Sequence, residues 1–130
     1  YANCCKPLPG DNIVAHFSQG RGLVVHRVNC KNMNDPQHND RKQYVQWSEH
    51  VEGEFLAGIR VQVANQRGAL ARMAAIISDM SSNIEQVSQS EKGGLITTNE
   101  FIISVRNRVH LARIMKKLRA LPEVNKISRM

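Results

Sequence analysis

The sequence predicts an α+β protein in two parts, a small cysteine-rich β/α unit and a larger unit with ferredoxin-like βαββαβ order. All three cysteines lie within the first thirty residues, which sets that part apart chemically. A polar stretch without strand or helix periodicity, residues 33–42, follows them. Later in the chain, apolar residues repeat first with the period of a strand and then with that of a helix, in the order strand, helix, strand, strand, helix, strand. We therefore expect units at 1–47 and 55–130, joined by a linker at 48–54.

The first unit is predicted to contain three short strands. Residues 13–17 and 23–26 are rich in valine and other strand formers, and the segment between them, 18–22, holds two glycines that permit positive φ in a turn. A third strand at 44–47 would close the sheet. A unit of about fifty residues buries little apolar surface, so we expect a zinc ion or a neighbouring domain to stabilise it.

The second unit begins with a half-buried strand and an amphipathic helix. Ile59, Val61 and Val63 alternate with polar residues or alanine, as in a strand with one buried face. A break at residues 65–68 separates this strand from an apolar stripe at spacings of three and four, which predicts a helix. The stripe consists of Leu70, Met73, Ala74, Ile77 and Met80.

The remaining elements of the second unit are a hairpin, a second helix and a final strand. Residues 84–89 predict a strand, and a glycine pair then turns the chain into a partner strand around Phe101. Asn107 is a suitable N-cap for the second helix, which Pro122 stops. A last strand follows at 124–128. This order places both helices on one face of an antiparallel sheet.

The composition excludes several classes of protein. Hydrophobic residues make up 42% of the chain and charged residues 22%, with a mean hydropathy of −0.39, which is typical of a soluble folded protein. No apolar run approaches the roughly 20 residues that span a bilayer, and we find no signal sequence. Three cysteines, two of them adjacent, make a poor disulfide framework, so we expect a reducing cytoplasm. Because the chain starts at Tyr1 instead of Met, we expect it to be a fragment of a longer protein.

The formal net charge of +7 predicts an anionic partner, with RNA or an acidic protein surface as the main candidates. A face of lysines and arginines that serves only solubility is the alternative. The candidate phosphate contacts are basic residues of the first unit. They are Arg21, Arg27, Lys31, Arg41 and Lys42.

The cysteines and one histidine of the first unit predict a metal site. Cys4, Cys5, His26 and Cys30 give the Cys₃His donor set of a tetrahedral zinc site. His26 and Cys30 are one helical turn apart, so a helix beginning near His26 would direct both toward one point. Neighbouring residues of a strand point to opposite faces, so the backbone at Cys4 and Cys5 must bend if both bind. The alternative is that all three are reduced cysteines without a metal.

The sequence predicts no catalytic centre in this chain. It has no His–Asp pair typical of metal-dependent hydrolases, no glycine-rich phosphate loop, and no nucleophile paired with a base at useful spacing. His16, His38 and His50 have no partners at ligand spacing, and we interpret them as ordinary strand or surface residues. We interpret His110 as a first-turn helix residue at a packing boundary.

Short motifs in both units resemble a known family. In the first unit they are, in order, Cys4-Cys5, Pro-x-Pro-Gly-Asp at 7–11, Gly-Arg-Gly at 20–22, Val-His-Arg at 25–27 and Cys-x-Asn at 30–32. This combination resembles the cysteine-rich regulatory domain of long RelA/SpoT-type enzymes, also called the zinc-finger or ribosome-intersubunit domain. In the second unit they are Asn-x-x-Gly-x-Leu at 65–70 and Arg-Val-His-Leu-Ala at 108–112, which resemble that family's ACT domain.

The resemblance is closest to the SpoT-like branch, whose members are bifunctional and mainly hydrolases. Two departures from the family pattern stand out. Asn29 occupies the position before the last cysteine, where the family often has aspartate. Asn65 begins the loop in which many ACT domains place an aspartate at the start of the ligand site.

The resemblance implies the regulatory C-terminal region of a bifunctional (p)ppGpp hydrolase and synthetase of the bacterial stringent response. In that family a manganese-bound His/Asp site carries out the 3'-pyrophosphohydrolase reaction, and a separate GTP pyrophosphokinase domain carries out synthesis. Both lie on the N-terminal side of the regulatory region. We therefore expect no catalysis and no manganese here, zinc as the candidate metal, and signals relayed through contacts with the catalytic domains of the same protein or with a regulatory protein.

The resemblance leaves two further functions open. One is a ribosome- or RNA-binding module of a RelA-type synthetase. The other is the ACT amino-acid sensor of a biosynthetic enzyme, with a branched-chain amino acid bound at a helix N-terminus by the loop Asn65, Gln66, Arg67 and Gly68. ACT domains commonly pair side by side, so a homodimer through this domain is the alternative to contacts with the rest of its own protein.

Overall fold

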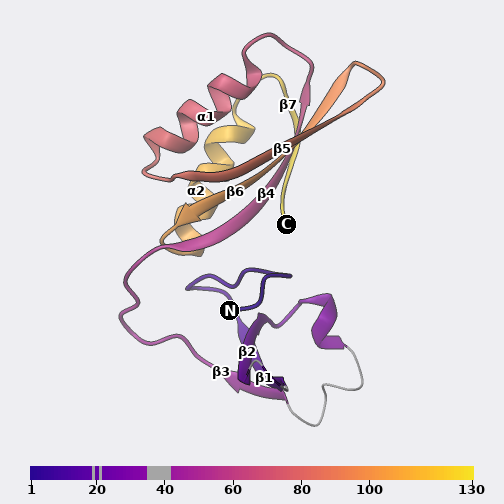
Figure 1. Ribbon diagram of the computed structural model, residues 1–130. Helices are drawn as coiled ribbons and strands as arrows, with labels where there is room; N and C mark the ends of the chain where they lie inside the picture. Colours follow the sequence, from indigo (N-terminus) through magenta and orange to yellow (C-terminus); the bar gives the residue numbers. More distant parts are fainter. Residues whose placement is uncertain (19, 21, 35–41) are drawn as a thin grey trace. The chain divides into compact units, whose positions relative to one another are not determined.

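The computed structural model confirms the predicted α+β class, with an antiparallel sheet in each of two units (Figure 1). It describes residues 1–130 except 19, 21 and 35–41. The units comprise Tyr1–Gly53 and Glu54–Met130. Each has buried apolar residues of its own.

The first unit is built on a three-stranded sheet in the order β2-β1-β3. Its elements are β1 (Ile13–Ser18), β2 (Gly22–Arg27), a 3₁₀ helix η1 (Lys31–Asn34) and β3 (Lys42–Val45). The central strand β1 pairs antiparallel with both neighbours. Gly20, in the turn between β1 and β2, has a φ of 86°, which is the left-handed conformation for which the glycines of this turn were expected.

The third strand lies two residues earlier than predicted, because the end of the predicted strand has other partners. The indole N–H of Trp47 donates to the main-chain oxygen of Asp11 at 3.0 Å. The same ring stacks on Tyr1, with ring centres 5.4 Å apart. These contacts hold Trp47 outside the strand pairing, so that β3 ends at Val45. Within β3, Tyr44 pairs with Val14 of β1.

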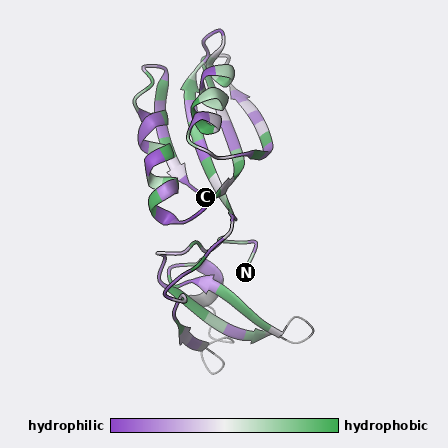
Figure 2. Cartoon of the chain, turned by 90° about the vertical axis from the view of Figure 1, so that its left-hand side faces the viewer, coloured by the Kyte–Doolittle hydropathy of each residue, from purple (hydrophilic) through white to green (hydrophobic). Residues whose placement is uncertain are grey.

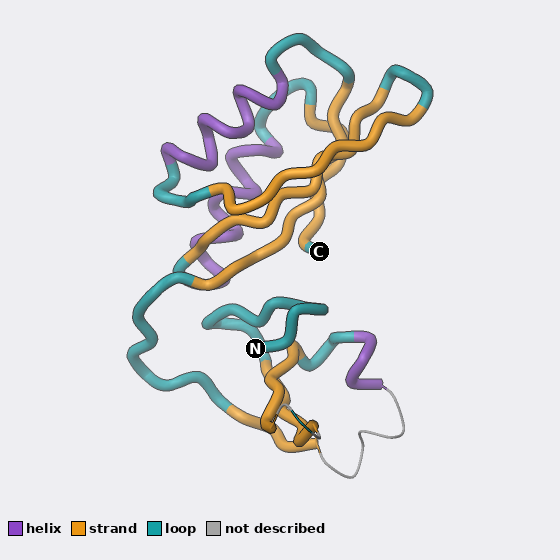
Figure 3. The backbone as a smooth tube through the Cα atoms, viewed as in Figure 1, coloured by secondary structure: helices purple, strands orange, loops and turns teal. Residues whose placement is uncertain are grey.

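The second unit has the βαββαβ order that the sequence predicts. Its elements are β4 (Phe55–Ala64), α1 (Ala69–Asp79), β5 (Ile84–Lys92), β6 (Ile96–Val105), α2 (Arg108–Arg119) and β7 (Val124–Arg129). The sheet order is β5-β6-β4-β7, and each pair of neighbours is antiparallel. Both helices cover the same face of this sheet, as in ferredoxin-like folds (Figure 1). The connection from β3 to β4 is loop throughout (Figure 3). In the described part of the chain, no helix has the length and apolar character that crossing a membrane requires.

The core of the second unit lies between the sheet and its two helices. Alternate residues of β4 point into it, so that Ile59 and Val61 are fully buried while Arg60 is exposed. Figure 2 shows the corresponding alternation of hydrophobic and hydrophilic segments along the strands. The helices contribute Met73, Ile77, Ile114 and Leu118, all fully buried. Removal of this apolar surface from water is the main stabilising term for the unit.

Two side chains fix the start of α2. Asn107, the predicted N-cap, accepts a hydrogen bond from the main-chain N–H of His110 at 2.8 Å. The ring of His110 is buried, its Nδ1 accepts the N–H of Arg106 at 3.0 Å, and its Nε2 lies 2.7 Å from the oxygen of Met80. Because Nδ1 accepts, the proton of the neutral ring is on Nε2 and is donated to Met80. His110 therefore ties α2 to the end of α1 and has both ring nitrogens engaged.

Candidate metal centre

The structure brings the four predicted ligands Cys4, Cys5, His26 and Cys30 together in the first unit. One donor atom from each lies within 4.8 Å of the others. Cys4 is exposed, whereas the other three side chains are buried. Two of these cysteines also belong to the small apolar core of the unit. That core consists of Ala2, Cys5, Val14 and Cys30, with Val24 packed against them.

A tight turn before β1 directs the two adjacent cysteines to the same point. The main-chain N–H of Lys6 donates to the oxygen of Ala2 at 3.0 Å, and the N–H of Ala2 donates to the oxygen of Val25 in β2 at 2.9 Å. Lys6 has a φ of 45°, in the left-handed region that residues other than glycine rarely adopt. Such a conformation costs on the order of 1–3 kcal/mol and persists only where the surroundings enforce it. The bend that the sequence requires at Cys4 and Cys5 is therefore a turn fastened to β2.

The predicted helix at His26 is wrong. His26 lies in β2, opposite Val14 of β1, and Cys30 follows β2 after a turn. The N–H of Cys30 donates to the oxygen of Arg27 at 3.0 Å, which returns the chain toward the cluster. The β-branched residues before His26, Val24 and Val25, favour a strand, and β2 pairs with β1 over its whole length. Strand pairing therefore prevails over the one-turn spacing on which the helix was predicted.

Three of the donor distances are close to the edges of a zinc tetrahedron. Metal–sulfur bonds of about 2.3 Å and metal–nitrogen bonds of about 2.0 Å give edges of about 3.5–3.8 Å. The sulfur of Cys4 lies 3.3 Å from Nδ1 of His26 and 3.5 Å from the sulfur of Cys30, and the sulfur of Cys5 lies 3.8 Å from the same Nδ1. All three cysteines are free thiols. All four donor atoms lie within 4.8 Å of one another, so the donor set fits zinc in its chemistry and lies close to the size of its tetrahedron.

The thiols differ in how readily they ionise. Burial raises the pKa of Cys5 to about 12, and the neighbouring thiols raise it too. The hydrogen bond that its sulfur accepts from the N–H of Arg27 at 3.3 Å acts in the opposite direction and lowers it. Burial also raises the pKa of Cys4, but hydrogen bonds with Asn32 and the neighbouring thiols outweigh it, and the pKa lies below its ordinary value. Clustered thiols ionise together where a cation compensates their charge, which a bound divalent metal does.

A second histidine, His16 of β1, adjoins the cluster, although its spacing in the sequence predicts an ordinary strand or surface residue. Its Nε2 lies 3.0 Å from Nε2 of His26, and both rings are buried. The signal that could have found it is the register of the β1–β2 hairpin. Val14 lies opposite His26, so His16, two residues further along, is a diagonal neighbour of His26 on the same face.

The structure describes the side chains of two of the five predicted phosphate contacts in the first unit. Lys31 is exposed, and Arg27 is half-buried with its main-chain N–H on the sulfur of Cys5. Arg21 and Arg41 lie outside the described residues, and so does the side chain of Lys42. These positions therefore stay a prediction.

Most of the positive charge belongs to the second unit and is concentrated on α2. Residues 1–53 contain six basic and five acidic residues, a formal charge of +1, whereas residues 54–130 contain twelve and six, a formal charge of +6. Between Glu100 and Glu123 there are six basic residues and no acidic one. All six are exposed, and they are Arg106, Arg108, Arg113, Lys116, Lys117 and Arg119. We call them the α2 basic cluster, and an exposed surface of one charge attracts anions.

The predicted ligand loop, residues 65–68, joins β4 to α1 and is fastened to the β5–β6 hairpin. The side-chain amide of Asn65 donates to the oxygen of Gly94 at 3.1 Å and to the carboxylate of Glu91 at 3.4 Å. Gly68 is the N-cap of α1, with a φ of 77° and no side-chain hydrogen bond. Amino-acid binding at this loop stays a prediction, which calorimetry with branched-chain amino acids would test.

An ion pair of Arg72 with Glu123 lies next to the same loop. The guanidinium of Arg72 in α1 donates to the carboxylate of Glu123 at 2.6 Å and to the main-chain oxygen of Arg67 at 3.1 Å. Its hydrogen bond holds the pKa of Glu123 below the ordinary carboxyl range. Arg72 thereby links the start of α1 to the connection between α2 and β7.

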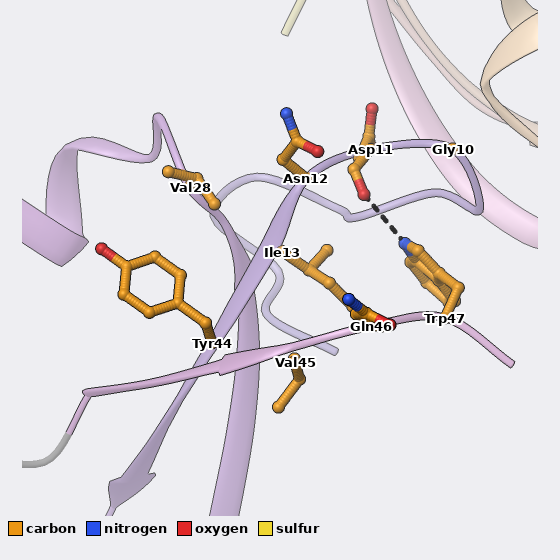
Figure 4. Close-up of a pocket in the computed structure, with 9 residues that line it drawn as sticks. All are labelled: Gly10, Asp11, Asn12, Ile13, Val28, Tyr44, Val45, Gln46 and Trp47. Carbon is orange, nitrogen blue, oxygen red and sulfur yellow. Dashed lines mark hydrogen bonds between the residues drawn. The ribbon is translucent and has the colours of Figure 1, made fainter.

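A groove of about 600 Å³ lies on the surface of the first unit (Figure 4). Tyr44 and Trp47 stand at opposite ends of it, with Ile13 between them. The carboxylate of Asp11 accepts the main-chain N–H of Leu8 at 2.8 Å, so this acidic group serves the local backbone. Among the residues that line the groove, no acid stands beside a base, so they offer no pair for acid–base catalysis.

Comparisons with known proteins match both units. Residues 1–48 match the family model of the RelA/SpoT RIS domain, and residues 52–129 match that of the ACT domain. The bifunctional (p)ppGpp synthase/hydrolase SpoT of Escherichia coli K12 is 41% identical over 130 residues, which are 99% of this chain and 18% of that protein. The GTP pyrophosphokinase of the same organism is 33% identical over 127 residues, 95% of this chain and 17% of that protein. The chain thus spans less than a fifth of the length of these relatives.

Solved structures match about three fifths of the chain. The crystal structure of the ACT domain from the GTP pyrophosphokinase of Chlorobium tepidum is 31% identical and covers 60% of this chain and 100% of that chain, with a TM-score of 0.53. A homoserine dehydrogenase from Thiobacillus denitrificans, 18% identical over 65% of this chain and 20% of its own, shares the fold alone at a TM-score of 0.51. The resemblance that the sequence motifs indicate is confirmed for both units.

Proposed function

The chain belongs to the ACT domain family and joins that domain to a RelA/SpoT RIS domain, and we propose that it is the regulatory C-terminal region of a bifunctional (p)ppGpp hydrolase and synthetase. The observation that carries this proposal is the match of both units, in order, to one region of the SpoT enzyme of Escherichia coli across 99% of the chain. The whole parent protein would then hydrolyse and synthesise (p)ppGpp in the cytoplasm, with its catalytic domains outside this chain.

In this proposal the region regulates through contacts that change the activities of catalytic domains elsewhere in the parent protein. Support comes from the chemistry of the described residues, whose buried titratable groups are engaged within their own units. Asp11 holds the backbone of Leu8, His110 ties α2 to α1, and Glu123 pairs with Arg72. Such groups position structure, and signals from partners reach the active sites through domain contacts.

A chimaera tests this proposal. The matched region of the Escherichia coli SpoT enzyme is replaced by this chain, and (p)ppGpp hydrolysis and synthesis are compared with the parent enzyme and with a truncated enzyme that lacks the region. We expect the chimaera to restore the parent's ratio of the two activities, and the chain alone to turn over no (p)ppGpp. A chimaera that behaves as the truncated enzyme, or turnover by the chain alone, would contradict the proposal.

We also propose that Cys4, Cys5, His26 and Cys30 hold a structural zinc ion in the first unit. The convergence of their donor atoms within 4.8 Å of one another supports it, as does the small apolar core cluster to which two of them belong. When bound, zinc supplies a cross-link between the turn before β1, strand β2 and the turn after it. The metal content of the purified chain, measured together with a Cys30→Ser variant, tests this. We expect one zinc per wild-type chain and a large loss in the variant, and a wild-type chain without zinc would contradict it.

A second candidate function is RNA binding by the α2 basic cluster. The observation that favours it is the run of six exposed basic residues without an acidic one. On one side of α2, Arg113, Lys116 and Lys117 line an opening of about 390 Å³ together with Met80 and Ala120. Phosphate contacts from three such residues would contribute about −2 to −3 to the slope of log affinity against log salt concentration, so binding would weaken as salt is added.

Salt-dependent binding to ribosomal RNA tests this candidate. The triple variant Arg113→Gln, Lys116→Gln, Lys117→Gln is compared with a charge-matched control, Arg60→Gln, Arg67→Gln, Lys126→Gln. We expect the first variant to lose affinity and salt dependence, and the control to keep most of both. Equal losses in the two variants would assign the attraction to net charge alone, and no binding at low salt would exclude the function.

A further inference from the structure

Two buried histidines, His16 and His26, share a hydrogen bond beside the four-ligand cluster. Their Nε2 atoms are 3.0 Å apart, the usual distance for a hydrogen bond between ring nitrogens. The ring planes differ by 25° and the ring centres are 4.9 Å apart. The two rings are therefore stacked with an offset that brings their Nε2 atoms together. At this distance one Nε2 can donate its proton to the other.

The β1–β2 hairpin places the two rings on the same face of its sheet. His16 pairs with Val24, and Val14 pairs with His26, so the histidines are diagonal neighbours. Diagonal partners lie within reach of long side chains. His16 is 7% exposed and His26 is 5% exposed, so solvent contributes little to orienting either ring.

The contacts of the other ring nitrogen of His26, Nδ1, determine which nitrogen carries the proton. Its Nδ1 lies 3.3 Å from the sulfur of Cys4 and 3.8 Å from that of Cys5. A neutral imidazole that binds a metal through Nδ1 has no proton there, so its single proton is on Nε2. Two Nε2 atoms at 3.0 Å share one proton, so His16 accepts it, and the proton of a neutral His16 ring is then on Nδ1.

We propose that His16 is a positioning residue of the metal site: its Nε2 accepts the Nε2–H of His26 and holds His26 with Nδ1 aimed at the cysteines. This inference rests on the proposed zinc site. Histidine ligands of metals generally donate their second N–H to a fixed acceptor, which sets the ring orientation and makes the ligand nitrogen more basic. In this chain a second imidazole fills that place, which a carboxylate or a carbonyl oxygen commonly takes.

Two substitutions at position 16 separate this role from packing. His16→Phe keeps a planar ring of similar shape but has no acceptor. His16→Gln has a carbonyl oxygen that can take the place of Nε2. Zinc affinity is measured by competition with a chromophoric chelator on the full chain, and cobalt is used as a spectroscopic probe, since its d–d bands report four-coordinate sites and its charge-transfer bands report thiolate ligands.

We expect His16→Phe to bind zinc about 10- to 100-fold more weakly than the wild type and to shift the cobalt d–d bands. We expect His16→Gln to stay within a few-fold of the wild type with nearly unchanged bands. Wild-type affinity and spectrum in His16→Phe would overturn the role of His16 and leave the zinc site intact. A wild-type chain that takes up neither zinc nor cobalt would overturn the zinc site, and the role of His16 with it.

Ring-nitrogen NMR of the zinc-loaded wild-type chain independently tests which ring nitrogens carry protons. Long-range proton–nitrogen correlations distinguish protonated from unprotonated ring nitrogens. The proposal requires a proton on Nε2 of His26 and an unprotonated Nε2 in His16. A proton on Nε2 of His16 would overturn it, whatever the affinities of the variants. The spectra of residues 54–130 serve as the internal control for folding.

Discussion

The two units of this chain are stabilised in different ways. In the second unit, residues from strands β4 and β6 and from both helices are fully buried, among them Ile59, Phe101, Ile77 and Leu118. In the first unit, two of the four residues in the buried core cluster are cysteines, and these also belong to the four-ligand cluster. From this difference we expect the second unit to fold on apolar burial, and we propose that the first depends on a zinc cross-link.

Replacing Cys5 has the largest expected effect on this comparison. If Cys5 is a zinc ligand, both Cys5→Ala and Cys5→Ser abolish zinc-dependent folding of the first unit, because each removes a ligand. If Cys5 is only a small buried residue, the alanine variant folds as the wild type does. Amide NMR spectra of the full chain resolve the two outcomes, and the signals of Glu54–Met130 should stay in place in both variants. A folded first unit in Cys5→Ala would contradict the account.

Matched leucine substitutions measure the apolar core of the second unit. Leu118 is fully buried and Leu95 is 78% exposed. Leu118→Ala should lower the free energy of unfolding of this unit by about 2–5 kcal/mol, because it removes buried surface and leaves a cavity. Leu95→Ala should change it by less than about 0.5 kcal/mol. Urea unfolding followed by helix circular dichroism checks both, and equal effects would mean that the core is wrongly located.

Gly68 offers a smaller test of the loop between β4 and α1. Its φ of 77° is unfavourable for residues with a Cβ, and an added Cβ would lie 3.1 Å from Nη1 of Arg72. We expect Gly68→Ala to destabilise the second unit by about 1–2 kcal/mol. Gly68→Asn should cost less, because asparagine tolerates the left-handed region. Unfolding midpoints that rank the two variants in the opposite order would argue against a purely conformational role for the glycine.

The ion pair of Arg72 with Glu123 predicts a modest pH dependence that belongs to the second unit. Arg72 lowers the pKa of Glu123, so the pair stabilises the folded state above the ordinary carboxyl range, and this contribution is lost as the pH falls through the lowered pKa. Glu123→Gln should therefore be less stable than the wild type at neutral pH, and the difference should shrink in acid. Denaturant unfolding at several pH values, with exposed Glu54→Gln as the control, checks this. A difference that does not change with pH would contradict the assigned cause.

The fold of the second unit could be predicted from the sequence because local signals agree there. The alternation of Ile59, Val61 and Val63 indicates a strand with one buried face, and the structure buries these three residues. Asn107 has the side chain that an N-cap requires, and it caps α2. In such elements the spacing of apolar residues and the capping residue point to the same structure.

The candidate metal centre could be predicted only in part. The four ligands follow from residue type, but the helix at His26 does not, because pairing with β1 determines the conformation there. The role of His16 depends on hairpin register, which sequence spacing alone does not fix. The α2 basic cluster was missed because the net charge of the whole chain does not reveal where the charge lies. Counting basic and acidic residues along the chain would have located it, because no acidic residue lies between Glu100 and Glu123.

The most direct test of the account is the amide NMR spectrum of the full chain before and after removal of zinc by a chelator. We predict that signals from Tyr1–Gly53 lose their dispersion without zinc and recover it when one equivalent is returned. Signals from Glu54–Met130 should keep their positions throughout. A first unit that stays folded without zinc, or a second unit that unfolds together with it, would contradict the claim that the two units are stabilised in different ways.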